Sequence, residues 1–130
     1  MTYKVVGVIF EITKKRYYFE VKDNYPYKKG DKVLVDTIRG QELGVVYGDP
    51  QILDEKVLVL PLKPVIKLAS ETEYNHYLEL REMADKAYEQ CKQKIFEHEL
   101  PMKLVAAEYT YDRSKLIFYF TSFFPGVTSF

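Results

Sequence analysis

Apolar and polar residues follow two different periods in the two halves of this chain. From Tyr3 to Leu62, short apolar runs alternate with turn residues, a spacing typical of a small antiparallel sheet. Gly44 interrupts one of these runs, and we expect it to mark a bulge or a sharp bend. The runs predict strands at Val5–Phe10, Arg16–Val21, Lys32–Thr37, Glu42–Tyr47 and Lys56–Leu60.

A helical period replaces this pattern in the second half. After the apolar run Val65–Ala69, Ser70 and Glu73 have the spacing of a capping box, in which each side chain bonds the other residue's backbone amide. The sequence therefore predicts an amphipathic helix over about residues 71–99, ended by Pro101. Its apolar stripe comprises Tyr77, Leu80, Ala84, Ala87, Tyr88, Cys91 and Ile95.

A β-hairpin is predicted next, over about residues 102–121. Positions 104–111 alternate with the period of two of a strand, Leu116–Thr121 repeats the pattern, and Asp112–Lys115 supplies the turn. The fold class is therefore α+β. We expect a small antiparallel β-barrel or curved sheet in residues 1–62, followed by a helix-plus-hairpin unit in residues 63–130.

Composition narrows the class of protein. The chain has 130 residues with 19 basic and 19 acidic side chains, so it lacks the net positive charge of a dedicated nucleic-acid binder. Cys91 is the only cysteine, which rules out an intrachain disulfide and a cluster of thiolate ligands. No apolar run reaches membrane-spanning length, and we expect a cytoplasmic protein.

Side chains with catalytic or ligand chemistry are few and scattered. Cys91, His76 and His98 are too few for a zinc site without another ligand, and Cys91 belongs to the apolar stripe. Neither Glu42 nor Glu108 has a second carboxylate placed for acid–base catalysis. We therefore assign no catalytic, cofactor or metal residue and expect a protein that is not an enzyme.

Two surfaces are candidates for binding other molecules. Partner-protein contacts are expected from helix aromatics and from polar residues at turns and strands, namely Tyr74, Tyr77, Tyr88, Arg39, Glu42 and Lys115. The cluster Lys14, Lys15 and Arg16, beside Tyr17 and Tyr18, is an alternative contact for RNA or DNA. Lys28 and Lys29 with Tyr25 and Tyr27 form a second such cluster, although solvated hairpin tips also explain these lysines.

Several segments together resemble the bacterial YaaT (RicT) family, whose members carry the PSP-one C-terminal domain. The resemblance covers almost all of residues 2–121, and its last segment is specific. The similarity of the Gly30–Val35 sequence to the family is weak evidence when taken alone, because other small barrels have similar sequences. The matching segments are Tyr3–Phe10, Val35–Val46, Leu60–Lys67, Glu89–Lys92 and Leu100–Thr121.

The resemblance implies a non-enzymatic regulator that works in protein complexes. Members of the family associate with small helical partners of the YlbF and YmcA type, in a complex linked to ribonuclease Y-dependent mRNA processing, sporulation, competence and biofilm development. They also bind iron–sulfur clusters through cysteines of a carboxy-terminal region. This chain stops before that region, so no cluster ligand is carried over, and Cys91 corresponds to a helix position.

The resemblance weakens after Thr121. Family members continue with a charged run that begins a second helix, whereas Gly126, Val127 and Phe130 echo that run without its charges. We therefore expect an incomplete PSP-one domain with apolar surface left exposed, and self-association or dependence on a partner. A truncated gene, an engineered fragment, a homo-oligomer and a partner complex all remain open.

Overall fold

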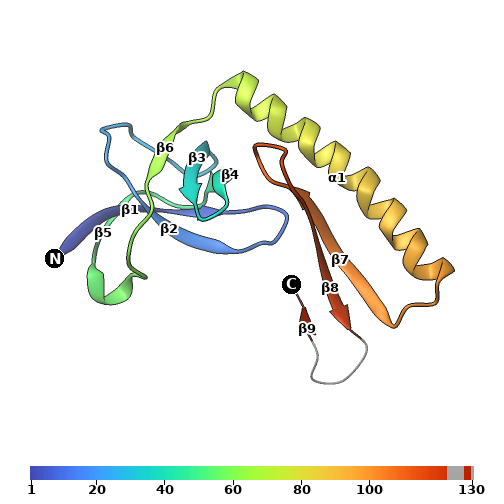
Figure 1. Ribbon diagram of the computed structural model, residues 1–130. Helices are drawn as coiled ribbons and strands as arrows, with labels where there is room; N and C mark the ends of the chain where they lie inside the picture. The colour runs from blue at the N-terminus through green and yellow to red at the C-terminus, as the bar shows by residue number, and fades with distance from the viewer. Residues whose placement is uncertain (123–127, 130) are drawn as a thin grey trace. The chain divides into compact units, whose positions relative to one another are not determined.

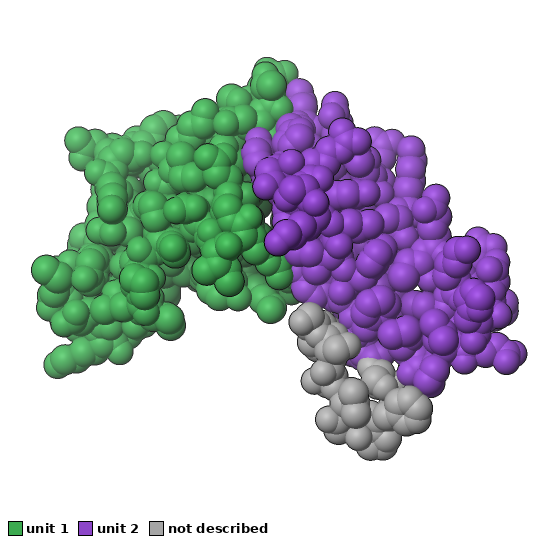
Figure 2. Space-filling model, viewed as in Figure 1, with its two compact units in different colours: residues 1–74 green, residues 75–130 purple. Residues whose placement is uncertain are grey.

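The computed structural model describes residues 1–122 and 128–129 of the chain (Figure 1). Contacts divide the chain into two compact units, residues 1–74 and 75–130 (Figure 2). The strand Val65–Leu68 pairs with Lys32–Thr37, which places it in the first unit. The domain boundary expected after residue 62 stays a prediction. Gly126, Val127 and Phe130 lie outside the described residues.

The first unit is an antiparallel sheet that curls round without closing. Its order is β2-β1-β4-β3-β6, with β5 paired to β1. The two outer strands of that path, β2 and β6, meet only near a bridge between Glu20 and Pro64, where the Glu20 amide donates to the Lys63 carbonyl at 2.9 Å. A curved sheet is therefore correct, and a closed barrel is not. The strands are β1 (Thr2–Ile9), β2 (Arg16–Glu20), β3 (Lys32–Thr37), β4 (Gly40–Val46), β5 (Gln51–Asp54) and β6 (Val65–Leu68).

Alternating β-branched residues build the core of this sheet. Val6 and Val8 of β1 lie on the same face as Val33 and Val35 of β3, as the period of two requires, and none of the four is exposed to solvent. Phe10 packs against the cluster from the end of β1. The full buried cluster is Val6, Val8, Phe19, Val21, Tyr27, Val33, Val35, Val46 and Val65.

One predicted strand is wrong. The apolar run Lys56–Leu60 is not a strand, because β5 forms earlier and pairs Leu53 with Tyr3. Asp54 then ends the strand by capping a short 3-10 turn, η1 (Glu55–Val57), and its side chain accepts a hydrogen bond from the Lys56 amide at 2.9 Å. The segment after η1 is left irregular and largely exposed.

The capping box predicted at the start of the helix is present. The Glu73 amide donates to Ser70 Oγ at 3.1 Å, and the Ser70 amide donates to Glu73 Oε1 at 2.9 Å. The hydrogen bond from the Ser70 amide, followed by that from Lys67 Nζ at 3.0 Å, holds the pKa of the Glu73 carboxyl below its usual value. The helix α1 spans Glu71–Glu97 and ends two residues before the predicted limit, where Glu99 adopts a left-handed φ of 50°.

The second unit contains most of α1 and a small sheet of order β7-β8-β9. His76 Nε2 lies 2.8 Å from the Tyr111 carbonyl oxygen, and the Tyr88 hydroxyl donates to the Leu104 carbonyl at 3.3 Å. The first turns of the helix thus meet the end of β7, so the helix and the strand run antiparallel (Figure 1). The strands are β7 (Met102–Tyr109), β8 (Leu116–Ser122) and β9 (Thr128–Ser129).

The alternation predicted for β7 fails at one position. The register with β8 shifts between Leu104 and Ala106, which places a bulge at Val105. Leu104 and Ala107 are consequently both buried although they are three positions apart, and Val105 is 49% exposed. A bulge depends on pairing across the hairpin, so the order of residues in β7 alone did not reveal it.

Candidate functional site

The β1–β2 turn brings three basic residues together, and we call Lys14, Lys15 and Arg16 the basic tip. The Lys14 amide donates to the Phe10 carbonyl at 2.8 Å, and the Phe10 amide donates to the Lys15 carbonyl at 3.0 Å. All three basic residues are exposed. Tyr17 and Tyr18, which follow directly, are 50% and 37% exposed. The turn therefore presents cations and accessible aromatic rings within a few residues of each other.

Arg16 is positioned by a contact with the ring of Tyr47, the residue that directly follows β4. Its guanidinium carbon lies 5.1 Å from the centre of the Tyr47 ring, a cation–π distance. The Tyr47 ring lies over Gly7 of β1, where the Cβ of any other residue would overlap it. Burial, together with the neighbouring Tyr18, raises the pKa of Tyr47, so its phenol stays neutral at physiological pH. Gly7 thus leaves room for the ring on which Arg16 rests.

The second basic and aromatic cluster is mainly structural. Tyr27 is 3% exposed and belongs to the core, and its hydroxyl donates to Asp23 Oδ2 at 2.8 Å. The Tyr25 ring packs on it with centres 4.8 Å apart. Lys28 and Lys29 are exposed beside this pair. Tyr25 is nevertheless 41% exposed, so this cluster presents its cations beside one accessible ring, whereas the basic tip presents two.

The three helix tyrosines expected to contact partners are half-buried. Tyr88 bonds the backbone of β7, as described above. Tyr77 faces Arg81, whose guanidinium carbon is 5.9 Å from the ring centre, and Tyr74 faces Lys32, with 5.6 Å between Nζ and the ring centre. Each ring has an interaction within its own unit, so a partner would reach only the remaining edges of these side chains.

The polar residues expected to contact partners are divided between the two units. Glu42 lies on β4, where its Oε2 accepts a hydrogen bond from Thr37 Oγ1. Arg39 is exposed in the turn between β3 and β4, and its amide donates to Thr37 Oγ1 at 3.1 Å. Lys115 is exposed in the other unit, at the β7–β8 turn. Arg39 and Glu42 thus belong to the β3–β4 hairpin of the first unit, and Lys115 belongs to the second unit.

Sequence reasoning did not single out two exposed apolar residues on the charged side of α1. Leu78 and Phe96 are 42% and 83% exposed, and their separation of five full turns places them on one face about 27 Å apart. The exposed carboxylates Glu82, Asp85 and Glu89 lie between them on that face. We call these five residues the helix outer face. The sequence did contain a signal for this surface, because these two apolar residues lie outside the predicted apolar stripe.

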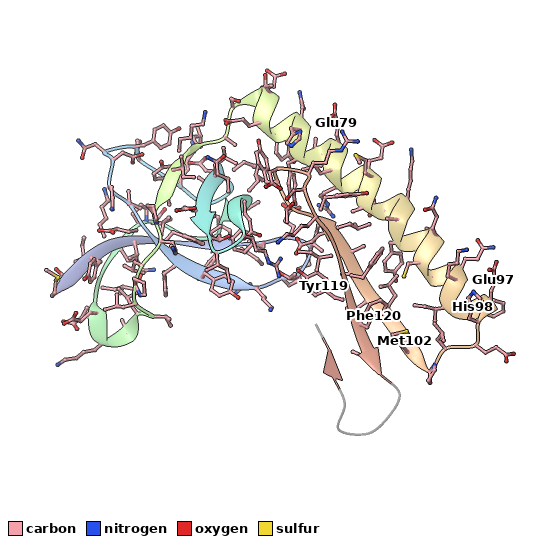
Figure 3. The ribbon with its side chains drawn as sticks, in the orientation of Figure 1. Glu79, Glu97, His98, Met102, Tyr119 and Phe120 are labelled. Carbon is pink, nitrogen blue, oxygen red and sulfur yellow. The ribbon has the colours of Figure 1, made fainter. Side chains whose placement is uncertain are left out.

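Residues with metal-binding chemistry lie apart. Cys91 is half-buried on α1, and His76 contacts Tyr111 near the other end of the helix. Figure 3 shows His98 at the opposite end of α1 from Glu79, which lies one turn beyond His76. Within residues 1–122 and 128–129, no group of three or more His, Cys, Asp or Glu side chains is placed to hold a metal ion.

In the described part of the chain, no helix combines the length and the apolar character needed to cross a bilayer.

Acid should weaken the β7–β8 turn through Asp112. Its Oδ1 accepts hydrogen bonds from Thr110 Oγ1 at 2.7 Å and from the Ser114 hydroxyl and amide at 2.7 and 2.9 Å, which lower the pKa of Asp112 to about 2. The folded pKa lies below the unfolded one of about 3.9, so the unfolded state binds more protons and stability falls as pH drops from about 4 to 2.

We expect Asp112→Asn to reduce that acid-dependent loss. The check is the melting temperature by circular dichroism at pH 6, 4 and 2.5 for wild type, Asp112→Asn and the control Asp49→Asn, whose carboxyl makes no such set of hydrogen bonds. The control should follow the wild-type pH profile. An Asp112→Asn profile parallel to that of the wild type would contradict the assignment.

Comparisons with known proteins give one family and one curated relative. A model of the "PSP1 C-terminal conserved region" matches residues 63–124, which include α1 and the β7–β8 hairpin. The chain is 40% identical over 120 residues to stage 0 sporulation protein YaaT of Bacillus subtilis (strain 168). The alignment covers 92% of this chain but 43% of YaaT, so the chain spans less than half of that relative's length. No solved structure matches the chain.

Proposed function

This chain belongs to the YaaT family of PSP1 proteins, and we propose on that basis that it is a cytoplasmic regulatory adaptor that acts by binding other proteins. The observation that carries the proposal is the 40% identity to a stage 0 sporulation protein across 92% of the chain. We further propose that its partners are small helical proteins of the YlbF and YmcA type, and that the complex influences ribonuclease Y-dependent mRNA processing. We assign no enzymatic or cofactor role to its side chains, Cys91 included.

The helix outer face supports binding to a protein. Phe96 is 83% exposed on an otherwise polar surface, and Leu78 offers a second apolar contact on the same face. The carboxylates of Glu82, Asp85 and Glu89 outnumber the exposed Lys92 on this face, which favours a partner with basic residues opposite them and apolar pockets at its ends. Aromatic anchors surrounded by polar residues are the usual energetic centres of such interfaces.

Binding to purified YlbF- and YmcA-type proteins tests the proposal by isothermal titration calorimetry. We expect Phe96→Ala to weaken binding at least about tenfold, because it removes an aromatic anchor. Ile38→Ala is the matched control, since Ile38 is 94% exposed on the other unit. Failure of both this chain and a full-length relative to bind either partner would refute the proposal.

The basic tip favours a second function, binding of single-stranded RNA or DNA. Its three cations would neutralise phosphates, while Tyr17 and Tyr18 offer rings on which bases stack. We expect the triple variant Lys14→Ala, Lys15→Ala, Arg16→Ala to weaken binding to a labelled oligonucleotide at least about tenfold at low salt and to flatten its salt dependence. Fluorescence anisotropy measures both. Lys28→Ala, Lys29→Ala is the control, and unchanged binding by the triple variant would remove this surface.

A further inference from the structure

Alternation along β2 separates the two tyrosines that follow Arg16. Tyr18 pairs with Gly7 of β1, so its side chain lies on the face of the sheet to which a Cβ of Gly7 would point. Tyr17 therefore points to the opposite face, where its ring centre lies 6.0 Å from that of Phe10. Arg16 is two positions before Tyr18 and shares its face. Of the two rings, Tyr18 is thus the one beside the Arg16 side chain.

Tyr47 belongs to the same face and ties the other two side chains together. Its phenol is hydrogen-bonded with that of Tyr18, and its ring centre lies 5.1 Å from the guanidinium carbon of Arg16. Tyr47 is half-buried, whereas Arg16 and Tyr18 are exposed. The next residue of β2 on this face, Glu20, is half-buried, and Lys22 Nζ lies 4.0 Å from its carboxylate. The exposed part of this face is therefore cationic and aromatic.

We propose that Arg16, Tyr18 and Tyr47, which we call the stacking site, bind one unpaired base of a single-stranded nucleic acid. The base stacks on the Tyr18 ring, and Arg16 holds its phosphate. Tyr47 is a positioning residue, because it contacts the guanidinium through its ring and does not touch the base. The inference rests on the nucleic-acid binding proposed for the basic tip, and it adds that binding requires unpaired bases as well as phosphates.

A strand without bases separates the two proposals. For DNA and for RNA, fluorescence anisotropy compares a labelled pyrimidine strand of about ten nucleotides with an abasic strand of the same length. In the series that binds more tightly, the wild-type chain should bind the abasic strand at least about fivefold more weakly, because its phosphates are kept but nothing stacks. No binding of any strand would refute both proposals, whereas equal binding of the pyrimidine and abasic strands would overturn the stacking site alone.

Matched variants on β2 test which ring stacks. We expect Tyr18→Ala to weaken binding of the pyrimidine strand at least about fivefold, and Tyr17→Ala less than about twofold. The two tyrosines are neighbours on one strand, so the variants match in residue type and in distance from the basic tip. Tyr18→Phe should bind like the wild type, because stacking needs the ring and not the hydroxyl. Equal losses in Tyr17→Ala and Tyr18→Ala would overturn the assignment.

A double-variant cycle tests the role of Tyr47. Tyr47→Leu removes the cation–π contact but keeps an apolar side chain, and it should weaken binding about threefold. Tyr47→Phe keeps the ring and should bind like the wild type. In the Arg16→Ala background Tyr47→Leu should cause no further loss, because its effect passes through Arg16. The same loss with and without Arg16 would show that Tyr47 does not position the guanidinium.

Discussion

Gly44→Ala is expected to destabilise the first unit by about 2–3 kcal/mol, although alanine adds a single methyl group. A Cβ at Gly44 would overlap Val8 Cγ1 and lie 3.2 Å from Phe10 Cε1 and 3.3 Å from the Ile9 carbonyl oxygen. Val8 has no exposed surface, so its side chain has no space into which to withdraw. The strands must therefore shift.

Gly48→Ala is the matched control for this prediction. No atom lies within 4 Å of the position that its Cβ would take, and its φ requires no glycine. Alanine there should leave stability unchanged or raise it slightly, because it restricts the unfolded chain. Urea unfolding followed by circular dichroism compares the two variants. Equal midpoints for Gly44→Ala and Gly48→Ala would show that the sheet tolerates a side chain at position 44.

Leu80→Ala is expected to cost about 3 kcal/mol and to loosen α1 from the β7–β8 hairpin. Leu80 is 4% exposed and lies one turn from the buried Ala84, on the side of the helix from which Tyr88 reaches β7. Truncation leaves a cavity in the layer between the helix and the sheet, and the neighbouring backbone closes it only in part.

Leu78→Ala on the same helix is the matched control, because it makes the same change in helix propensity without removing a buried side chain. Leu78 is 42% exposed, so the same change of residue should alter stability by no more than about 0.5 kcal/mol. The readouts are the urea midpoint and the hydrogen-exchange protection of β7 amides, which should fall for Leu80→Ala alone. Similar losses in both variants would indicate that the helix is not held through its apolar stripe.

The local sequence pattern was sufficient to predict most elements of this fold. The β3 strand begins and ends where the sequence predicted, and the Ser70–Glu73 capping box forms both of its expected hydrogen bonds. Residues of the predicted apolar stripe, from Tyr77 to Ile95, are buried or half-buried. Such features depend on contacts between residues close in the chain, or on a period that one buried face imposes.

The candidate surfaces were predictable only in part. Lys14, Lys15 and Arg16 meet at one turn because they are adjacent in sequence. The support of Arg16 by Tyr47 depends on pairing between β1 and β4, which adjacency does not reveal. Phe96 became a candidate only when its exposure was known, since an aromatic residue in a helix is more often packed.

By itself, the sequence determined the class of fold, the order of most elements, the helix with its cap, and membership of the YaaT family. Tertiary structure decided three further matters: Gly44 is needed because Val8 fills the space beside it, β7 bulges at Val105, and Lys56–Leu60 does not join the sheet. Each depends on which distant strand lies alongside. Burial and pairing between residues far apart in the chain compete with local propensity, and at these positions they prevail.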